Sequence, residues 1–293
     1  MSTARTRATE RVLARVDHVH GWDYRVQRAL AGGFQSGATL VRDPRRGPAV
    51  LKWSADPGRA PDVLAAGQLL GPLRAAGWPT PAWLASGRTP QGWPYQLQEV
   101  LPGAPAERIT RSWLDEVLPL LDSHAGAAPP GGCAWSRTDR AVVFEDAHGH
   151  LSTVAGSSGE GAAFAAAVAA MSRDLHGVVL PEDDLVHGDL SEGNVLLVDG
   201  RLSGVVDVEA LGHGSRLHDL ATLTVHSALR GEDSCTARLL EAACEVADPG
   251  QFELSLIAVA AAELAFGVRH WAPVDAAAAG RTCTEVLRTV CDT

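Results

Sequence analysis

The segment from residue 185 to residue 209, LVHGDLSEGNVLLVDGRLSGVVDVE, constrains the fold of this chain more than any other. Its apolar residues form three short runs at 185–186, 195–198 and 202–206, which predict three β-strands. Asp199-Gly200 stands between the last two runs and predicts a tight hairpin turn. The polar residues of the segment lie at the strand ends, and they are His187, Asp189, Asn194, Asp207 and Glu209. The sequence therefore predicts a hairpin that gathers polar side chains at its open end.

A hairpin of this kind brings Asn194 and Asp207 close together although they are far apart in the sequence. Together with Asp189 they offer three oxygen-bearing side chains around one small volume. Hard oxygen ligands suit Mg²⁺, which usually takes one or two protein carboxylates and leaves its other positions to water and phosphate oxygens. The pattern therefore predicts a magnesium site, and Asp189, held on a tight loop, is a candidate base.

The pattern HGDxxxxN, followed by the acidic pair Asp207 and Glu209, resembles the catalytic loop and metal-binding segment of aminoglycoside phosphotransferases and their relatives. These enzymes share the protein-kinase-like fold. The resemblance implies that Asp189 accepts the proton of the substrate hydroxyl, and that Asn194 and Asp207 hold Mg²⁺ ions bridging the nucleotide phosphates. It further implies that His187 supports the loop. A chance turn-rich loop is the alternative reading of the same residues.

Composition limits the other classes of function. The chain has 293 residues and a formal net charge of −10, which argues against a nucleic-acid partner and is compatible with a cationic substrate. Its five cysteines are odd in number and show no CxxC spacing, so neither a disulfide framework nor a zinc site is indicated. We find no apolar run long enough to span a bilayer and no apolar signal core near the first residues. The expectation is a soluble cytoplasmic protein without a membrane partner.

Lys52 is the only lysine in a chain whose other strongly basic residues are all arginine. A compact ammonium and a planar guanidinium are not interchangeable, so a single lysine suggests a site where arginine would not serve. Lys52 lies in the apolar run 49–53, which predicts a strand. A strand lysine that extends along the surface to water is the alternative. In the family that the chain resembles, a strand lysine pairs with nucleotide phosphates, and the resemblance implies that role here.

A glycine-rich bend separates the first two predicted strands, at 24–30 and 34–41. Gly33 of this bend, with Ser36 and Gly37 just after it, offers backbone N–H groups to phosphate oxygens. An ordinary hairpin has the same composition, so the nucleotide role depends on the lysine strand that follows.

The next helix is predicted at 60–76, with Pro61 in its first turn and Gly77 as its stop. In the resembling family this helix carries a glutamate that pairs with the strand lysine, and no glutamate is present here. Asp62 is the nearest carboxylate and Gln68 the nearest long polar side chain. The sequence leaves the partner of the lysine open.

Two more strands, at 83–86 and 93–100, lead to the break Pro102-Gly103, which predicts a boundary between lobes. We accordingly expect a nucleotide-binding lobe at 1–100 and a catalytic and substrate-binding lobe at 101–293. By resemblance, three backbone positions of the connection hydrogen-bond the adenine edge, and they are Gln98, Glu99 and Val100.

The second lobe is predicted to be mostly helical, with helices at 109–124 and 160–176 and three or four more within 221–293. The stretch 125–158 shows no readable pattern. Asp219 matches the family's aspartate that braces the catalytic loop. Substrate contacts are expected from the C-terminal helices and the acidic pair, and the candidate residues are Glu209, Glu263, His270 and Trp271.

These observations predict an α+β, bilobal, protein-kinase-like fold, with an antiparallel N-lobe sheet, one main helix on it, and a larger helical C-lobe. The resemblance implies an O-phosphotransferase that moves the γ-phosphate of ATP or GTP to a hydroxyl of a cationic small-molecule antibiotic, with Mg²⁺ as cofactor. The expected acceptor is an aminoglycoside or a tuberactinomycin peptide such as viomycin or capreomycin, whose modifying enzymes look similar in length and motif layout. A metabolic kinase of choline, homoserine or sugar type and a nucleotide-binding pseudokinase are the alternatives. The sequence leaves monomer and dimer open.

Overall fold

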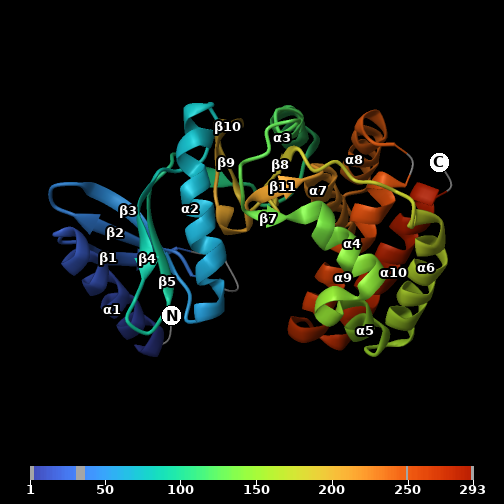
Figure 1. Ribbon diagram of the computed structural model, residues 1–293, viewed down its shortest axis with the longest axis horizontal. Coiled ribbons are helices and arrows are strands. Elements are labelled where there is room, and N and C mark those ends of the chain that lie inside the picture. The colour runs from blue at the N-terminus through green and yellow to red at the C-terminus, as the bar shows by residue number, and fades with distance from the viewer. Residues whose placement is uncertain (1–2, 31–36, 249, 292–293) are drawn as a thin grey trace. The chain divides into compact units, whose positions relative to one another are not determined.

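The computed structural model describes residues 3–30, 37–248 and 250–291. Two compact units make up the chain (Figure 1). Unit 1 consists of residues 1–105, 130–132 and 193–210, and unit 2 consists of residues 106–129, 133–192 and 211–293. This division places the segment 193–210 with the N-terminal part of the chain. The simple boundary between residues 100 and 101 stays a prediction.

Unit 1 is built on a five-stranded antiparallel sheet in the order β1-β2-β3-β5-β4. The strands are β1 (Arg25–Ala29), β2 (Thr39–Asp43), β3 (Gly47–Trp53), β4 (Trp83–Arg88) and β5 (Pro94–Glu99). Short turns join β2 to β3 and β4 to β5, and the helix α2 intervenes between β3 and β4. The predicted antiparallel N-lobe sheet is confirmed.

Different helices pack on the two faces of this sheet. Side chains alternate along each strand, so neighbouring residues of β3 face opposite sides. Ala49, Leu51 and Trp53 of β3 are buried in one cluster with the apolar side of α1 (Thr3–His20). Lys52 points to the opposite face. There the sheet packs on α2 (Ala60–Ala75), which follows the short 3₁₀-helix η1 (Pro57–Arg59).

The predicted hairpin is present in unit 1 as β9 (Val195–Val198) and β10 (Arg201–Val205), with β6 (Ala104–Pro105) paired to the outer side of β9. Asp199 and Gly200 have φ of 49° and 79° in its turn. Positive φ at both central residues suits the right-handed twist of a two-residue hairpin, which explains the Asp-Gly pair. The 3₁₀-helix η3 (Val208–Ala210) follows directly.

Unit 2 is mainly helical. A small sheet of three strands joins β7 (Cys133–Ala134), β11 (Gly212–Gly214) and β8 (Asp184–Val186). Its helices are α3 (Arg111–Asp122), α4 (Trp135–Glu145), η2 (Ala147–Gly149), α5 (His150–Ala155), α6 (Gly159–Leu175), α7 (Leu217–Leu229), α8 (Asp233–Val246), α9 (Gln251–His270) and α10 (Pro273–Cys291). The expected helices near 109–124 and 160–176 are confirmed. The stretch 125–158, which gave no pattern, contains α4 and α5.

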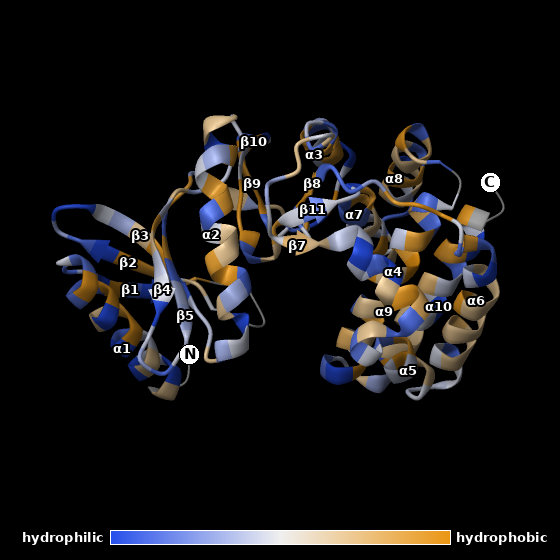
Figure 2. Ribbon diagram, viewed as in Figure 1, coloured by the Kyte–Doolittle hydropathy of each residue, from blue (hydrophilic) through white to orange (hydrophobic). Residues whose placement is uncertain are grey.

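Helix α9 forms the core of unit 2 and packs against α4, α5, α7 and α10 (Figure 1). Most of its residues are apolar, as its colour in Figure 2 shows. Among the described residues it is the one helix long and apolar enough to cross a membrane, although the sequence analysis found no apolar run of that length. The burial of 67% of its apolar window inside the unit is the pattern of a core helix.

Candidate active site

The loop that carries Asp189 begins where β8 ends, in unit 2. The buried carboxylate of Asp219, near the start of α7, accepts the backbone N–H of His187 at 2.8 Å and that of Gly188 at 2.9 Å. The Asp189 N–H in turn donates to Nδ1 of the buried His187 ring at 3.2 Å. Three consecutive amides of the loop are therefore held by side chains. Asp189 itself lies exposed to solvent.

A second support of this loop comes from α4 and was not predicted. His218 Nδ1 lies 2.9 Å from Asp139 Oδ1, and both side chains are buried. Burial opposes the charged imidazolium, but the Asp139 carboxylate outweighs it and raises the pKa of His218 above its usual range. The same ring donates a hydrogen bond to the Gly188 carbonyl. Because Asp139 lies 79 residues from His218, no local sequence signal could have revealed the pair.

Gly188 is required for steric reasons. It has φ of +81°, and a Cβ atom there would come within 2.2 Å of the Trp135 ring. The glycine of the HGD pattern thus lets the loop turn against an aromatic side chain from α4.

In unit 1, Lys52 faces two carboxylates. Its Nζ lies 2.6 Å from Glu209 Oε1 and also hydrogen-bonds Asp207 Oδ1. Gln96 of β5 donates from Nε2 to the same Glu209 oxygen at 2.8 Å. Burial raises the pKa of Glu209 to about 7 against the opposing effect of Lys52. Burial lowers the pKa of Lys52, but Glu209 and Asp207 together bring it above its usual value.

The expected contact of Glu209 with the acceptor or the metal stays a prediction, and the contacts that the structure gives this side chain are with unit 1. The Glu209 side chain is only 6% exposed and contacts Lys52 and Gln96 within unit 1. Sequence reasoning also missed Gln96, although it lies directly opposite Lys52 in the pairing of β3 with β5.

Asn194 and Asp207 lie at the open end of the hairpin. The Val206 N–H donates to the Asn194 carbonyl at 2.8 Å, which brings the next residue, Asp207, beside Asn194. Asp207 has φ of 65°, and its side chain is 32% exposed. One carboxylate and one amide oxygen are a donor set that fits Mg²⁺, since this ion keeps water and phosphate in its remaining positions. Among the described residues there is no cluster of three or more His, Cys, Asp or Glu that could hold a metal by itself.

The roles expected for residues around the nucleotide base and phosphates stay predictions, and the structure gives the surroundings of some of these residues. Gly33 and Ser36 lie outside the described residues. A Cβ at Gly37 would come within 2.8 Å of an Arg5 guanidinium nitrogen, so Gly37 packs against α1. Gln98 is buried, and Val100 is 43% exposed. The Glu99 side chain binds Arg74 Nη1 at 2.8 Å and accepts the Ala82 N–H at 2.9 Å, so it ties α2 to the sheet.

Of the expected substrate residues in unit 2, Glu263 lies beside His226, a histidine whose pKa the loop residue Asp189 affects. His226 Nε2 of α7 lies 3.7 Å from Glu263 Oε2 of α9. Burial lowers the pKa of His226, but Glu263, Glu192 and Asp189 together raise it. His270 and Trp271 lie at the end of α9, where both rings pack with Phe266.

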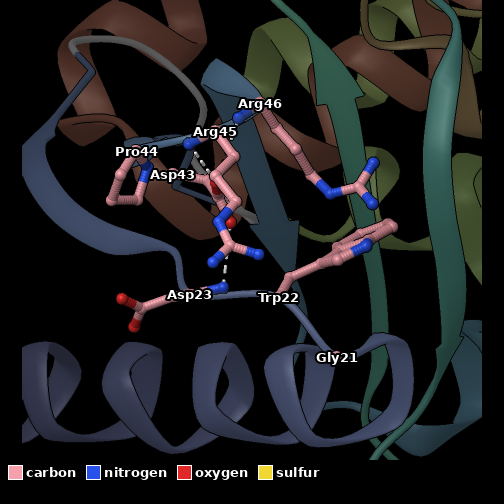
Figure 3. Close-up of a pocket in the computed structure, with 7 residues that line it drawn as sticks. All are labelled: Gly21, Trp22, Asp23, Asp43, Pro44, Arg45 and Arg46. Carbon is pink, nitrogen blue, oxygen red and sulfur yellow. Dashed lines mark hydrogen bonds between the residues drawn. The ribbon is translucent and has the colours of Figure 1, made fainter.

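The hollow shown in Figure 3 is a separate feature of unit 1, at the turn between β2 and β3. Asp43 accepts the N–H groups of Asp23, Arg45 and Arg46, and the Arg46 guanidinium lies 4.9 Å from the Trp22 ring centroid. None of the predicted site residues that the structure describes lines it. Its contacts are those of a capped turn.

Comparisons with known proteins give the family and the fold of the chain. A model of the phosphotransferase enzyme family matches residues 26–255. No curated protein matches the sequence.

Solved structures of antibiotic kinases share the fold. A thermostable mutant of aminoglycoside phosphotransferase APH(4)-Ia, in complex with AMP-PNP and hygromycin B, has a TM-score of 0.71 at 18% identity over 96% of this chain and 99% of that chain. The macrolide 2′-phosphotransferase MphH from Brachybacterium faecium has a TM-score of 0.56 at 19% identity over 92% and 96%. Amicoumacin kinase hAmiN, bound to AMP-PNP and Ca²⁺, has a TM-score of 0.61 at 13% identity over 98% and 96%.

Proposed function

The chain belongs to the phosphotransferase enzyme family, and we propose that it inactivates a cationic antibiotic by transferring the γ-phosphate of ATP or GTP to one of its hydroxyl groups. The observation that carries this proposal is the Asp189 loop. Its backbone amides are fixed by the buried Asp219 and His187, while the Asp189 carboxylate is exposed. A carboxylate held in this way can orient a substrate hydroxyl and accept its proton.

In this proposal unit 1 binds the nucleotide. The ammonium of Lys52 attracts the phosphates, while Asn194 and Asp207 hold Mg²⁺. The ion would neutralise charge on the transferred phosphate. Catalysis then depends mainly on the positions of the reactants and on charge stabilisation, because phosphoryl transfer requires little other chemistry from the protein.

The acceptor in this proposal is a polyamine antibiotic. The net charge of −10 and the exposed base favour a cation. Structures of the same fold have been solved with hygromycin B and with amicoumacin, and this supports an antibiotic as the class of substrate. Glu263, His270 and Trp271 are the proposed contacts, and a tuberactinomycin peptide remains the proposed alternative to an aminoglycoside. Because ATP is cytoplasmic, we expect the enzyme there.

The direct test is to incubate the protein with Mg²⁺, ATP or GTP, and a panel of aminoglycosides, tuberactinomycins and macrolides, and to search for a phosphorylated product by mass spectrometry. A phosphate on one polyamine antibiotic, absent with Asp189→Ala, is the expected result. Nucleotide turnover without any antibiotic product would favour a metabolic kinase. A protein that binds nucleotide without any turnover would be a pseudokinase.

A further inference from the structure

The lysine of a protein-kinase-like site needs an acidic partner that fixes its position, and in this fold the partner ordinarily comes from the neighbouring helix. Here α2 has no glutamate, and its Asp62 is exposed to solvent. The α2 residue that lines the same small pocket as Lys52 is Val63. Helix α2 therefore contributes an apolar side chain where a carboxylate is expected.

Glu209, from the short helix η3 after the hairpin, lies in that place. Its Oε1 is 2.6 Å from Lys52 Nζ, and the two side chains are 6% and 7% exposed. Gln96, which faces Lys52 across the β3–β5 pairing, donates to the same oxygen. Two adjacent side chains on one face of the sheet thus fix a single carboxylate oxygen. A buried carboxylate with a charge-assisted partner and a second donor is strongly localised.

The two acidic partners of Lys52 differ in access to solvent. Asp207 is 32% exposed, whereas Glu209 is 6% exposed. Glu209 Oε2 has no hydrogen-bond partner among the described residues, so loss of the lysine would leave this buried carboxylate with even less compensation. Asp207 can exchange its lysine contact for other cations, but Glu209 cannot do so without a large desolvation penalty.

We propose that Glu209 is the positioning residue of Lys52, in place of the missing helix glutamate, and that Lys52 keeps Glu209 but leaves Asp207 when a nucleotide phosphate binds. Asp207 is then released to hold Mg²⁺. This inference rests on the proposed function, because it assumes that Lys52 binds the nucleotide. It assigns to Glu209 a role in unit 1 in place of a contact with the acceptor.

The test is a double-mutant cycle on AMP-PNP affinity, measured by calorimetric titration in the presence of Mg²⁺. Glu209→Gln keeps the shape of the side chain and removes its charge. We expect a loss of affinity of about 10- to 100-fold, the usual effect of removing a residue that orients a ligand-binding group. In a Lys52→Met background the same change should alter affinity less than about twofold, because a residue that acts through the lysine has nothing left to position. Glu10→Gln, an exposed carboxylate on α1, is the matched control.

Several results would overturn the inference. Unchanged AMP-PNP affinity in Glu209→Gln would do so, as would an equal loss in the Lys52→Met background, which would indicate a general structural effect. If Glu209→Gln changed only the KM for the antibiotic, Glu209 would be a contact of the acceptor substrate instead. If the Glu209→Gln variant does not fold, AMP-PNP affinity is measured for Glu209→Asp instead. Weaker AMP-PNP binding by that folded variant would support a positioning role of Glu209, and unchanged binding would exclude it. A wild-type protein that binds no AMP-PNP would overturn the proposed function as well.

Discussion

The two units of this protein carry opposite net charges. Unit 1 contains 14 Lys and Arg against 10 Asp and Glu, and unit 2 contains 11 against 25, which gives net charges of +4 and −14 and the total of −10. A basic unit suits a polyanionic nucleotide, and an acidic unit suits a cationic acceptor. The total charge hides this division. The total charge of a chain that binds two substrates therefore does not indicate the charge of either one, whereas the charge of each unit does.

The units also use their key carboxylates differently. Asp189 of unit 2 is exposed on a loop whose backbone is held by buried groups. Glu209 of unit 1 is itself buried and holds a lysine. We therefore expect changes in unit 2 to affect mainly the chemical step and the acceptor, and changes in unit 1 to affect mainly the nucleotide.

The largest expected effect follows from Asp189→Asn. Removing a general base should lower kcat by about 10²- to 10⁴-fold. AMP-PNP affinity should stay within about twofold, because the change lies in unit 2. Steady-state rates and calorimetric titration would measure the two quantities. Asp183→Asn, another exposed carboxylate of unit 2, is the control. Loss of nucleotide affinity with unchanged kcat would contradict the assignment of Asp189.

Lys52→Arg tests the nucleotide side of the comparison. The planar guanidinium cannot occupy the position of the ammonium between Glu209 and Asp207, so we expect kcat/KM for the nucleotide to fall about 10- to 100-fold. The KM for the antibiotic should change little. Initial rates at varied nucleotide and fixed antibiotic would show the split. A variant with full activity would mean that any cation serves at this position.

Asp139→Asn tests the buried support of the loop and its pH dependence. Leaving His218 without its carboxylate should cost about 1–3 kcal/mol of the free energy of unfolding. The pKa of His218 is raised in the folded state, so its stabilising effect is present below the usual pKa of about 6.5 and is lost as pH rises through the higher folded value. The difference in melting temperature between wild type and variant should therefore shrink from pH 6 to pH 9. A difference that grows with pH would refute the charged pair.

The smallest expected effect concerns the acidic unit as a whole. If its net charge of −14 attracts a cationic antibiotic, raising the salt concentration from about 0.01 to 0.15 M, which shortens the Debye length from about 30 to 8 Å, should raise the antibiotic KM several-fold. An uncharged acceptor that the enzyme also phosphorylates is the control, and its KM should not change with salt concentration. Equal KM values at both salt concentrations would remove the charge argument for a cationic substrate.

Much of the fold was predictable because its signals are local. The hairpin around Asp199-Gly200, the lysine strand and most of the helices follow from hydrophobic period and turn residues, and the structure places them within a few positions of the predicted ranges. Helices α4 and α5 were missed, since glycine, proline and alanine dominate their neighbourhood and no periodic pattern stands out there.

The site was predictable only where its residues share one motif. Asp189, Asn194 and Asp207 occupy one continuous segment, and the hairpin that joins the last two is a local structure. The partners of the motif were not predictable. Gln96 reaches Glu209 across 113 positions, and Asp139 reaches His218 across 79. Contacts of such separation leave no trace in a single sequence.

The sequence by itself determined the family motif, the antiparallel sheet and the single lysine, because hydrophobic period, turn chemistry and residue type act over a few neighbouring positions. Only the tertiary structure decided which carboxylates face Lys52 and which of them is buried. The sequence shows that α2 lacks a glutamate, but burial against the sheet selects Glu209, and burial is a property of the packed chain. Glu209, which the sequence analysis predicted as a substrate contact, is in the structure a partner of Lys52.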